Sequence, residues 1–410
     1  MTGTAPDRIV TLDIIRGIAV MGIFSVNVIA FAMIDGAYFN PAAYGGHTGI
    51  DLFVWAANMV VIDGKLRTLF SMLFGASMLL IAERAEAAGY SQWSMHLRRM
   101  TVLFLIGLAH FYFLWWGDIL NHYAVIGLIA FLFRDKSPRA LIVWAFLFLA
   151  IDLLLFGGIV ATMYQFDIAG HAANASGEAI AQWNEIAAEF YPSAAKLAEQ
   201  QLIYGGSYQT RLTEMLTNRA AEPFTFIFLF GPETMSLMLF GMWGYKSGFL
   251  TGAWDDASYR RIALIAIPIG ALAFGAIVVV DIASGFYLPY VFAGLSVASA
   301  PFRPLMAFGY AALIILACRN PGWLAQRFAA VGRMAFTNYL GTSLIAAFVF
   351  YGWGLGLYGQ VSRAEAWLLV PIVWGIMLLW SKPWLERFRY GPLEWLWRSL
   401  ARWQFQPMRK

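Results

Sequence analysis

The feature that most constrains this chain is a series of apolar runs, each long enough to cross a lipid bilayer as a helix. A transmembrane helix needs about 20 apolar residues and satisfies its backbone polar groups within the segment. Such runs recur from residue 14 almost to residue 381, and 60% of the 410 residues are hydrophobic against 13% charged. Soluble domains carry roughly 25% charged residues. The sequence therefore predicts an all-α polytopic membrane protein.

We expect about ten transmembrane helices in this sequence. They are predicted at residues 14–34, 66–82, 100–117, 119–133, 140–162, 223–245, 262–281, 304–318, 335–353 and 365–381. The third and fourth adjoin at Gly117, which predicts a tight hairpin or one broken element. Two shorter apolar stretches, 51–62 and 287–300, are predicted as interfacial or re-entrant helices.

The basic residues indicate an orientation. Most of the 28 lysines and arginines fall on one side if the expected spans alternate, among them Arg98, Arg99, Lys136 and the tail at 382–410. The 163–222 connection on the other side has three basic residues against seven acidic residues. The positive-inside rule therefore predicts cytoplasmic termini and an outer 163–222 connection.

These expectations divide the chain into four parts. They are an N-terminal membrane half with five spans (1–162), an extracytoplasmic loop with one or two amphipathic helices (163–222), a C-terminal membrane half with five spans (223–381) and a cytoplasmic basic tail (382–410).

Composition also narrows the functional classes. Cys318 is the single cysteine, so an internal disulfide or a cysteine-based metal cluster is excluded. No HxxH or HExxH spacing occurs, and no metal site is expected. The net charge of +4 follows from membrane topology, so membrane lipids are the expected partners and nucleic acid is not. The oligomeric state stays open, with a homodimer as one arrangement.

Ionisable residues inside the spans are the candidate site residues, because each costs roughly 2.5–3.5 kcal/mol on insertion scales. Asp13 and Arg16 in "LDIIRG" share one helix face, which predicts either a mutual ion pair or a clamp for an anionic substrate. Asn27 lies three turns further along that face. Lys65 heads the second span, where snorkelling to the interface is its simplest explanation.

Two carboxylates complete the set of buried charges. Glu233 follows Pro232 in "FLFGPETMSL", where a proline frees a backbone carbonyl and helps to form a polar pocket. Asp152 lies mid-span with no polar neighbour in the sequence. The Glu233 pattern is typical of proton carriers in transporters and equally of contacts that join helices. Asp152 either pairs with a cation or an amide from another helix or is neutral.

The stretch "GLAHFYFLWWGDILNHYAVIG" holds the most reactive candidate. His110 and Asp118 share a helix face but stand about 12 Å apart along a straight helix. Asp118 is also suited to N-cap the fourth helix, and Trp115 and Trp116 are typical of an interfacial aromatic belt. A buried imidazole should be paired and titrates near neutrality, so His110 is either the general base, for which it is the best candidate, or a histidine satisfied within the core. We expect both residues to line a polar cavity on the outer side, with Asn27 as a third wall.

Several strings in order resemble one family. They are "RIVTLDIIRGIAVMGIFSVNVIAF", "AYFNPAAYGG", "KLRTLFSMLFGA", "HFYFLWWGDILNHYAVIGL", "GRMAFTNYL" and "YGPLEWLWRSL". Together they resemble the YeiB-like integral membrane proteins of bacteria, a family with a domain of unknown function. The resemblance implies a multi-pass protein of the bacterial cytoplasmic membrane.

That family is related to the transmembrane acyltransferases, whose first-helix signature is similar to "LDIIRG". In the bacterial sugar O-acyltransferases an arginine is followed eleven positions later by an essential histidine, whereas Arg16 here is followed at that spacing by Asn27. The lysosomal heparan-glucosaminide acetyltransferase resembles this chain in having asparagine there and takes its histidine from the next outer loop. That loop contains His47 here, but not at the matching distance, so His110 is preferred as the base.

The resemblance suggests an acyltransferase that moves an acyl group from a cytoplasmic donor to an extracytoplasmic or lipid acceptor. His110 and Asp118 would be catalytic, and Asp13, Arg16, Asn27, Lys65 and Glu233 would bind substrate. An acyl-CoA would be the donor substrate, and no tightly bound cofactor is expected. The alternative is a transporter or binder of a lipophilic small molecule, such as a quinone, a lipid or a small anion, with Glu233 and Asp152 as proton-linked carboxylates. A third hypothesis is a membrane structural or sensory protein without catalysis.

Overall fold

The computed structural model of the chain describes residues 9–188 and 190–410. All regular elements in this part of the chain are helices, which confirms the all-α prediction. In chain order they are α1 (Val10–Ala32), α2 (Asp35–Phe39), α3 (Gly49–Val61), α4 (Lys65–Ala87), α5 (Gln92–Phe113), α6 (Leu120–Ala130), the 3₁₀ turn η1 (Phe131–Phe133), α7 (Pro138–His171), α8 (Gly177–Ala188), α9 (Ala194–Tyr204), α10 (Tyr208–Thr217), α11 (Glu222–Leu229), α12 (Gly231–Lys246), α13 (Asp256–Ala283), α14 (Leu288–Ala293), the π-helical turn η2 (Gly294–Ala298), α15 (Phe302–Ala317), α16 (Trp323–Arg333), α17 (Ala335–Phe350), α18 (Arg363–Trp367), α19 (Leu369–Arg387) and α20 (Pro392–Arg402).

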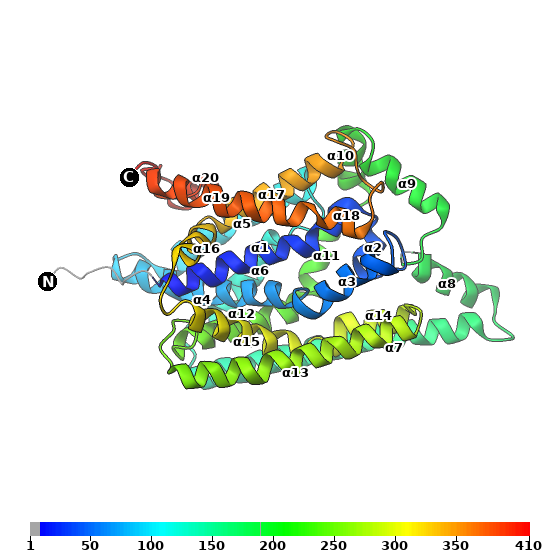
Figure 1. The fold of residues 1–410 in the computed structure, drawn as a ribbon, viewed down its shortest axis with the longest axis horizontal. Coiled ribbons are helices and arrows are strands. Elements are labelled where there is room, and N and C mark those ends of the chain that lie inside the picture. The colour runs from blue at the N-terminus through cyan, green and yellow to red at the C-terminus, as the bar shows by residue number, and fades with distance from the viewer. Residues whose placement is uncertain (1–8, 189) are drawn as a thin grey trace.

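The helices form one elongated bundle (Figure 1). The start of α1 and the C-terminus lie at one end, here called the terminal end. The helices α8 and α9 lie at the opposite end, here called the distal end, and α10 lies beside the last turns of α17 (Figure 1). The long connection at 163–222 contains the end of α7 and the three helices α8, α9 and α10, rather than the one or two helices expected.

The structure has five helices that are long and apolar enough to cross a membrane, or seven if two bent pairs each count as one span. The bent pairs are α11 with α12, at 60°, and α14–η2 with α15, at 53°. Each expected range falls on one helix or on two consecutive helices. A count of ten spans is not confirmed, because α6 and α17 are shorter apolar helices and α5 is not among the candidate spans.

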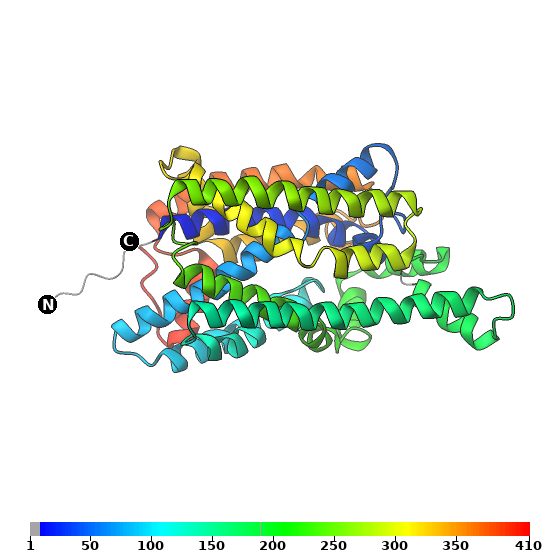
Figure 2. The ribbon, with the colours of Figure 1, turned by 90° about the horizontal axis from the view of Figure 1, so that it is seen from below.

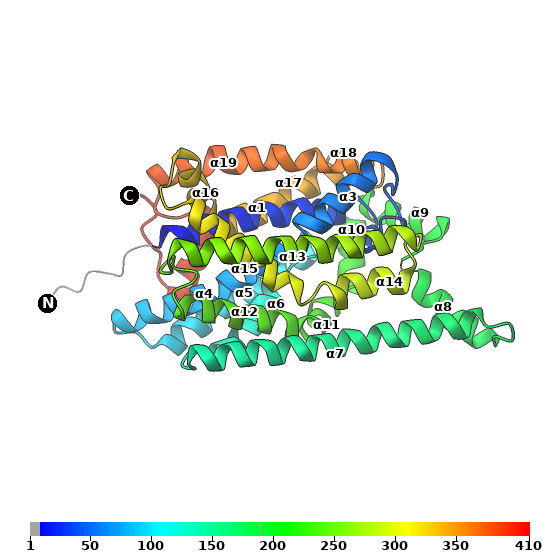
Figure 3. The ribbon, with the colours of Figure 1, turned by 60° about the horizontal axis from the view of Figure 1, so that its bottom comes forward.

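The helices α7 and α13 run along the surface of the bundle (Figures 2 and 3). Only 28% and 33% of their most apolar windows are buried inside the protein, and the remaining apolar side chains face outward. A soluble monomer rarely exposes such continuous apolar surfaces. These helices therefore fit a membrane protein.

Helix α1 lies inside the bundle, where it packs against α4, α16 and α17. Its closest approach is to α16, where a Cβ atom on Gly17 would lie 2.1 Å from the carbonyl oxygen of Phe328. Helices α4 and α12 cross in the same way: Gly75 lies against the backbone of Met238. Small residues allow such close approach in membrane bundles.

Candidate functional site

The turn after α5 brings His110 and Asp118 together. The helix ends at Phe113, because the backbone N–H groups of Leu114 and Trp115 both donate to the carbonyl of His110, at 2.9 Å each. The chain then folds back and enters α6 at Leu120, so α5 and α6 form the hairpin that was one of the two expectations. The expected separation of about 12 Å along a straight helix is wrong, because the helix ends before Asp118.

His110 and Asp118 form a buried pair. The Nδ1 atom of His110 lies 2.6 Å from Oδ2 of Asp118, and both residues are 5% exposed. The other carboxylate oxygen accepts the backbone N–H groups of Leu120 at 2.7 Å and Asn121 at 3.3 Å. Asp118 thus satisfies the start of α6, as expected, and orients the imidazole at the same time.

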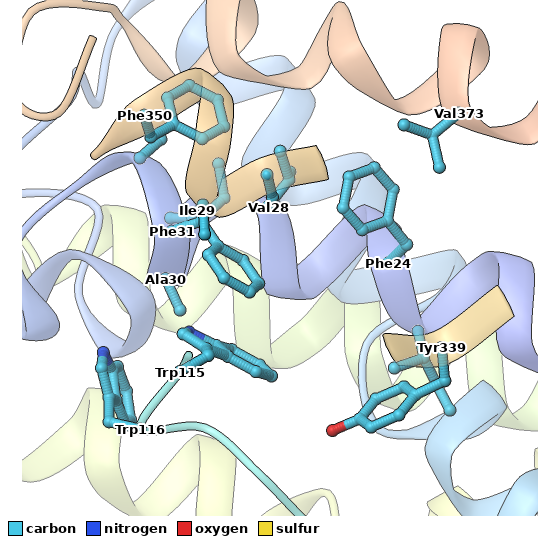
Figure 4. Packing of buried hydrophobic residues seen from close by; sticks show 14 of the residues in the cluster. Phe24, Val28, Ile29, Ala30, Phe31, Trp115, Trp116, Tyr339, Phe350 and Val373 are labelled. Atoms are coloured by element: carbon cyan, nitrogen blue, oxygen red, sulfur yellow. The ribbon is translucent and has the colours of Figure 1, made fainter. Parts of the chain in front are cut away.

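The second imidazole nitrogen of His110 has no hydrogen-bond partner among the described residues. The imidazole centroid lies 5.7 Å from the ring of Tyr339 and 6.3 Å from that of Trp115. Phe31 from α1 stacks on Trp115 at 4.3 Å, and Trp116 lies beside this pair (Figure 4). Trp115 and Trp116 are buried, so they do not form the outward-facing belt that was expected.

A cavity of about 180 Å³ lies in the terminal half of the bundle. Four arginines line the part nearest the terminal end: Arg16, Arg99, Arg333 and Arg398. The deeper walls are mostly apolar and include Leu103, Ile119, Leu120 and Tyr339. The lining suits a ligand with an anionic end and an apolar end.

This cavity differs in two respects from the expected one. It lies in the terminal half instead of opening on the distal side, and neither His110 nor Asp118 lines it. The cavity is connected to the His110–Asp118 pair through Tyr339, which lines the cavity and also contacts the His110 ring. Asn27 is half-buried on α1, and no hydrogen bond links it to the pair within the described chain.

Asp13 and Arg16 pair as expected. The Nη1 atom of Arg16 lies 3.3 Å from Oδ1 of Asp13, and Nη2 donates to the hydroxyl of Ser77 at 2.6 Å. Since Arg16 also lines the cavity, the ion pair and the anion clamp are compatible roles.

Glu233 lies in a separate cluster at the bend between α11 and α12. It accepts hydrogen bonds from Arg67 at 3.0 Å and from Arg303. Asp152 is buried within electrostatic range of this cluster, and its Oδ1 atom has no hydrogen-bond partner in the described chain. Glu233 therefore joins α12 to α4 and α15 through these two arginines.

Lys65 does not reach the interface by snorkelling. It is fully buried, donates to the carbonyl of Met59 and lies 2.9 Å from the ring centroid of Phe274. The expectation fails because the chain bends at Gly64, so the start of α4 lies beneath α3 and α13 rather than at an exposed helix end.

Of the cavity residues, the sequence singled out Arg16 but not the other three arginines or Tyr339. Arg99 and the basic tail that contains Arg398 indicated only topology. His47, the second candidate base, is exposed and packs edge-on against Phe286, away from the pair.

Glu394 on α20 closes one side of the cavity. Its carboxylate accepts the backbone N–H groups of Phe336 and Thr337, at 2.8 and 3.0 Å, at the first turn of α17. Burial raises the pKa of the Glu394 carboxyl, and the hydrogen bonds from Thr337 and Phe336 act in the opposite direction. Among the described residues, no group of three or more His, Cys, Asp or Glu side chains is placed to hold a metal ion.

Comparison with known proteins identifies relatives along the whole chain. A family model described as protein of unknown function (DUF418) matches residues 244–404. The chain is 31% identical to the uncharacterized protein YxaH of Bacillus subtilis (strain 168), over 98% of this chain and 96% of that protein. It is 32% identical to the uncharacterized protein YeiB of Escherichia coli (strain K12), over 96% of each. No solved structure is a significant match. The chain therefore belongs to the YeiB-like family, which carries the domain of unknown function DUF418.

Proposed function

We propose that this protein is a membrane acyltransferase that takes an acyl group from an acyl-CoA at its terminal end, with His110 as the general base. The observation that carries the proposal is the buried His110–Asp118 pair, joined at 2.6 Å, with the second imidazole nitrogen unpartnered. A carboxylate on Nδ1 holds the proton there and leaves Nε2 free to accept another.

The cavity supports the choice of donor. An acyl-CoA joins phosphates to an acyl chain, and the arginines near the terminal end provide forked donors for phosphate. The apolar walls beyond them end at Tyr339, whose ring contacts His110. A donor bound there with its phosphates on Arg99 and Arg398 would have its acyl end directed toward the pair.

The proposed step balances without a redox partner. The oxygen or nitrogen atom of an acceptor hydroxyl or amine attacks the thioester carbonyl, and the Nε2 atom of His110 takes the proton of that acceptor group. The carbon–sulfur bond breaks, and the thiolate leaves with the proton returned by His110. Asp118 acts as a positioning residue, because it stabilises the imidazolium without touching substrate.

The proposed orientation places the terminal end, with both termini, in the cytoplasm of a bacterium and the distal end outside. The charge distribution supports it, since Arg98, Arg99 and Lys136 lie in or beside the first turns of α5 and α7. The acceptor would then be a lipid or an extracytoplasmic molecule.

The test is thiol release from acetyl-CoA and palmitoyl-CoA by the protein in proteoliposomes, with a bacterial membrane extract as the acceptor source. A Cys318→Ser background removes the protein's own thiol from the readout. His110→Asn should lower the rate at least about 100-fold, the usual contribution of a general base. Its side-chain amide still donates to Asp118, so the melting temperature should change little.

His122→Asn is the matched control. His122 is also a buried histidine of this region, and its Nε2 atom lies 2.8 Å from the hydroxyl of Thr234. This variant should retain most of the wild-type rate. The proposal fails if the wild type releases no thiol above empty vesicles, or if His110→Asn matches His122→Asn.

The alternative of a proton-coupled carrier has weaker support. A proton-carrying carboxylate must lose its charge during the cycle, whereas Glu233 is held between Arg67 and Arg303. Neutralising it would leave two buried guanidinium groups without their shared partner, which is costly.

A further inference from the structure

Arg211 on α10 is a buried cation without a carboxylate partner. It is 1% exposed, and its Nη2 atom donates to the carbonyl of Tyr112 at 3.3 Å. Its Nε and Nη1 atoms have no hydrogen-bond acceptor, and it forms no ion pair in the described part of the chain. A buried guanidinium is unfavourable unless an anion compensates its charge, and no carboxylate of the described chain does so.

Carboxylates are available nearby but are bound to another arginine. Arg219, two turns further along the chain, lies 2.9 Å from Asp35 and 2.7 Å from Glu222. It also donates to the hydroxyl of Tyr204 at 2.6 Å. The fold thus pairs one of the two buried arginines of this connection and leaves the other with unused donors.

Further donors without acceptors lie in a neighbouring group of aromatic residues, Phe31, Trp115, Tyr351 and Tyr358, here called the aromatic cluster. The hydroxyl groups of Tyr351 and Tyr358, which are 0% and 3% exposed, have no hydrogen-bond partner among the described residues, and neither has the indole nitrogen of Trp115. The Arg211 guanidinium lies 5.7 Å from the ring of Tyr351. Buried donors normally have partners, so their concentration here calls for an acceptor.

The cluster is continuous with the His110 pair. The ring of Phe31 lies 6.1 Å from that of Tyr351 and 4.3 Å from that of Trp115. Trp115 in turn lies 6.3 Å from His110. Figure 4 shows the Phe31 and Trp115 rings together with Phe350, the last residue of α17.

We propose that this cluster binds the anionic oxygen group of a small hydroxyl-bearing ligand, a carboxylate or a phosphate, with Arg211 as its counter-ion. The anion would compensate the guanidinium charge, and the tyrosine hydroxyls would donate to the remaining ligand oxygens. The aromatic faces suit a ring-shaped body. Because Arg211 is 1% exposed, access requires a shift of α10, the helix that carries it.

The binding of an anion stands independently of acyl transfer. Its further role, as the site of an anionic acceptor beside His110, rests on the proposed function. The experiment therefore measures binding directly and treats turnover separately.

The probes are glucuronate, glucose 6-phosphate and glucose, titrated by calorimetry into the detergent-solubilised full chain. They share one ring and differ in carboxylate, phosphate or no charge. At least one charged probe should bind, about tenfold or more tighter than glucose. The charged probe that binds more tightly identifies the type of anion.

Arg211→Met should weaken binding of that probe about tenfold or more without lowering the melting temperature, because it removes an unpaired buried charge. Lys196→Met, which removes the same charge from the same connection, should leave binding unchanged. Tyr358→Phe removes one unused hydroxyl with little change of shape and should weaken binding severalfold.

The proposal is overturned if neither charged probe binds more tightly than glucose, or if Arg211→Met binds as the wild type does. If Arg211→Met fails to fold, Arg211→Lys and Tyr358→Phe decide: unchanged binding by both overturns the proposal. His110→Asn should bind the probe normally. Normal probe binding by a protein without acyl transfer would retain the anion site and remove only its role as an acceptor site.

Discussion

At the scale of single residues, the buried charges differ in how completely they are compensated. Glu233 is held by two arginines, from α4 and α15. Asp152 is equally enclosed, but its Oδ1 atom has no hydrogen-bond partner among the described residues. Breaking a compensated buried pair is costly, whereas neutralising a poorly compensated charge is not.

This contrast predicts opposite effects of two isosteric changes. Glu233→Gln should destabilise the protein by about 3–5 kcal/mol, because it leaves two guanidinium groups without a counter-charge. Asp152→Asn should be neutral or stabilising. Thermal melting of both variants in the same detergent provides the comparison, and equal destabilisation would show that Asp152 is also fully compensated.

At the scale of elements, α20 is attached to the bundle through a helix terminus. Glu394 accepts two backbone N–H groups at the start of α17, and its other oxygen contacts the Thr337 hydroxyl. Trp397 donates to the carbonyl of Arg99 at 2.9 Å. The basic tail therefore forms a wall of the cavity and determines which groups line its terminal end.

Glu394→Ala should lower stability by about 0.5–2 kcal/mol, the usual cost of losing such a cap. It should also detach α20, which limited proteolysis of the C-terminal segment would detect as faster cleavage. Glu394→Gln keeps an acceptor oxygen for both N–H groups and should be cleaved nearly as slowly as the wild type. If the two variants are cleaved alike, the carboxylate does not hold α20.

At the scale of the whole molecule, the arrangement separates an arginine-rich cavity at one end from an aromatic cluster with unused donors at the other. The His110 pair lies between them, since Tyr339 contacts it from the cavity side and Trp115 from the cluster side. Transfer from a cytoplasmic donor to an extracytoplasmic acceptor, as proposed above, requires the two ends to face opposite sides of a membrane.

Cysteine labelling tests that orientation. In a Cys318→Ser background, a cysteine replacing the exposed Ile180 on α8 should react with a membrane-impermeant reagent in intact cells. A cysteine replacing Lys136, before α7, should react only after permeabilisation. The reverse pattern would contradict the orientation deduced from the positive charges.

The amino-acid sequence by itself determined where most helices form. Each apolar run satisfies its own backbone hydrogen bonds, so a run such as 140–162 becomes helical wherever it lies in the bundle. The same reasoning identified His110, Asp118, Glu233 and Asp152, because an ionisable group in an apolar run requires a partner.

Only the tertiary structure decided which partners these residues have. Glu233 is bound to arginines 166 and 70 positions away, and Asp118 reaches His110 because α5 ends at Phe113. Lys65 is buried beneath a neighbouring helix, and Arg211 has no carboxylate at all in the described chain. Hydropathy reports how each residue partitions between water and lipid, whereas pairing depends on where helices cross and where they break, and those positions are set by packing between segments distant in the sequence.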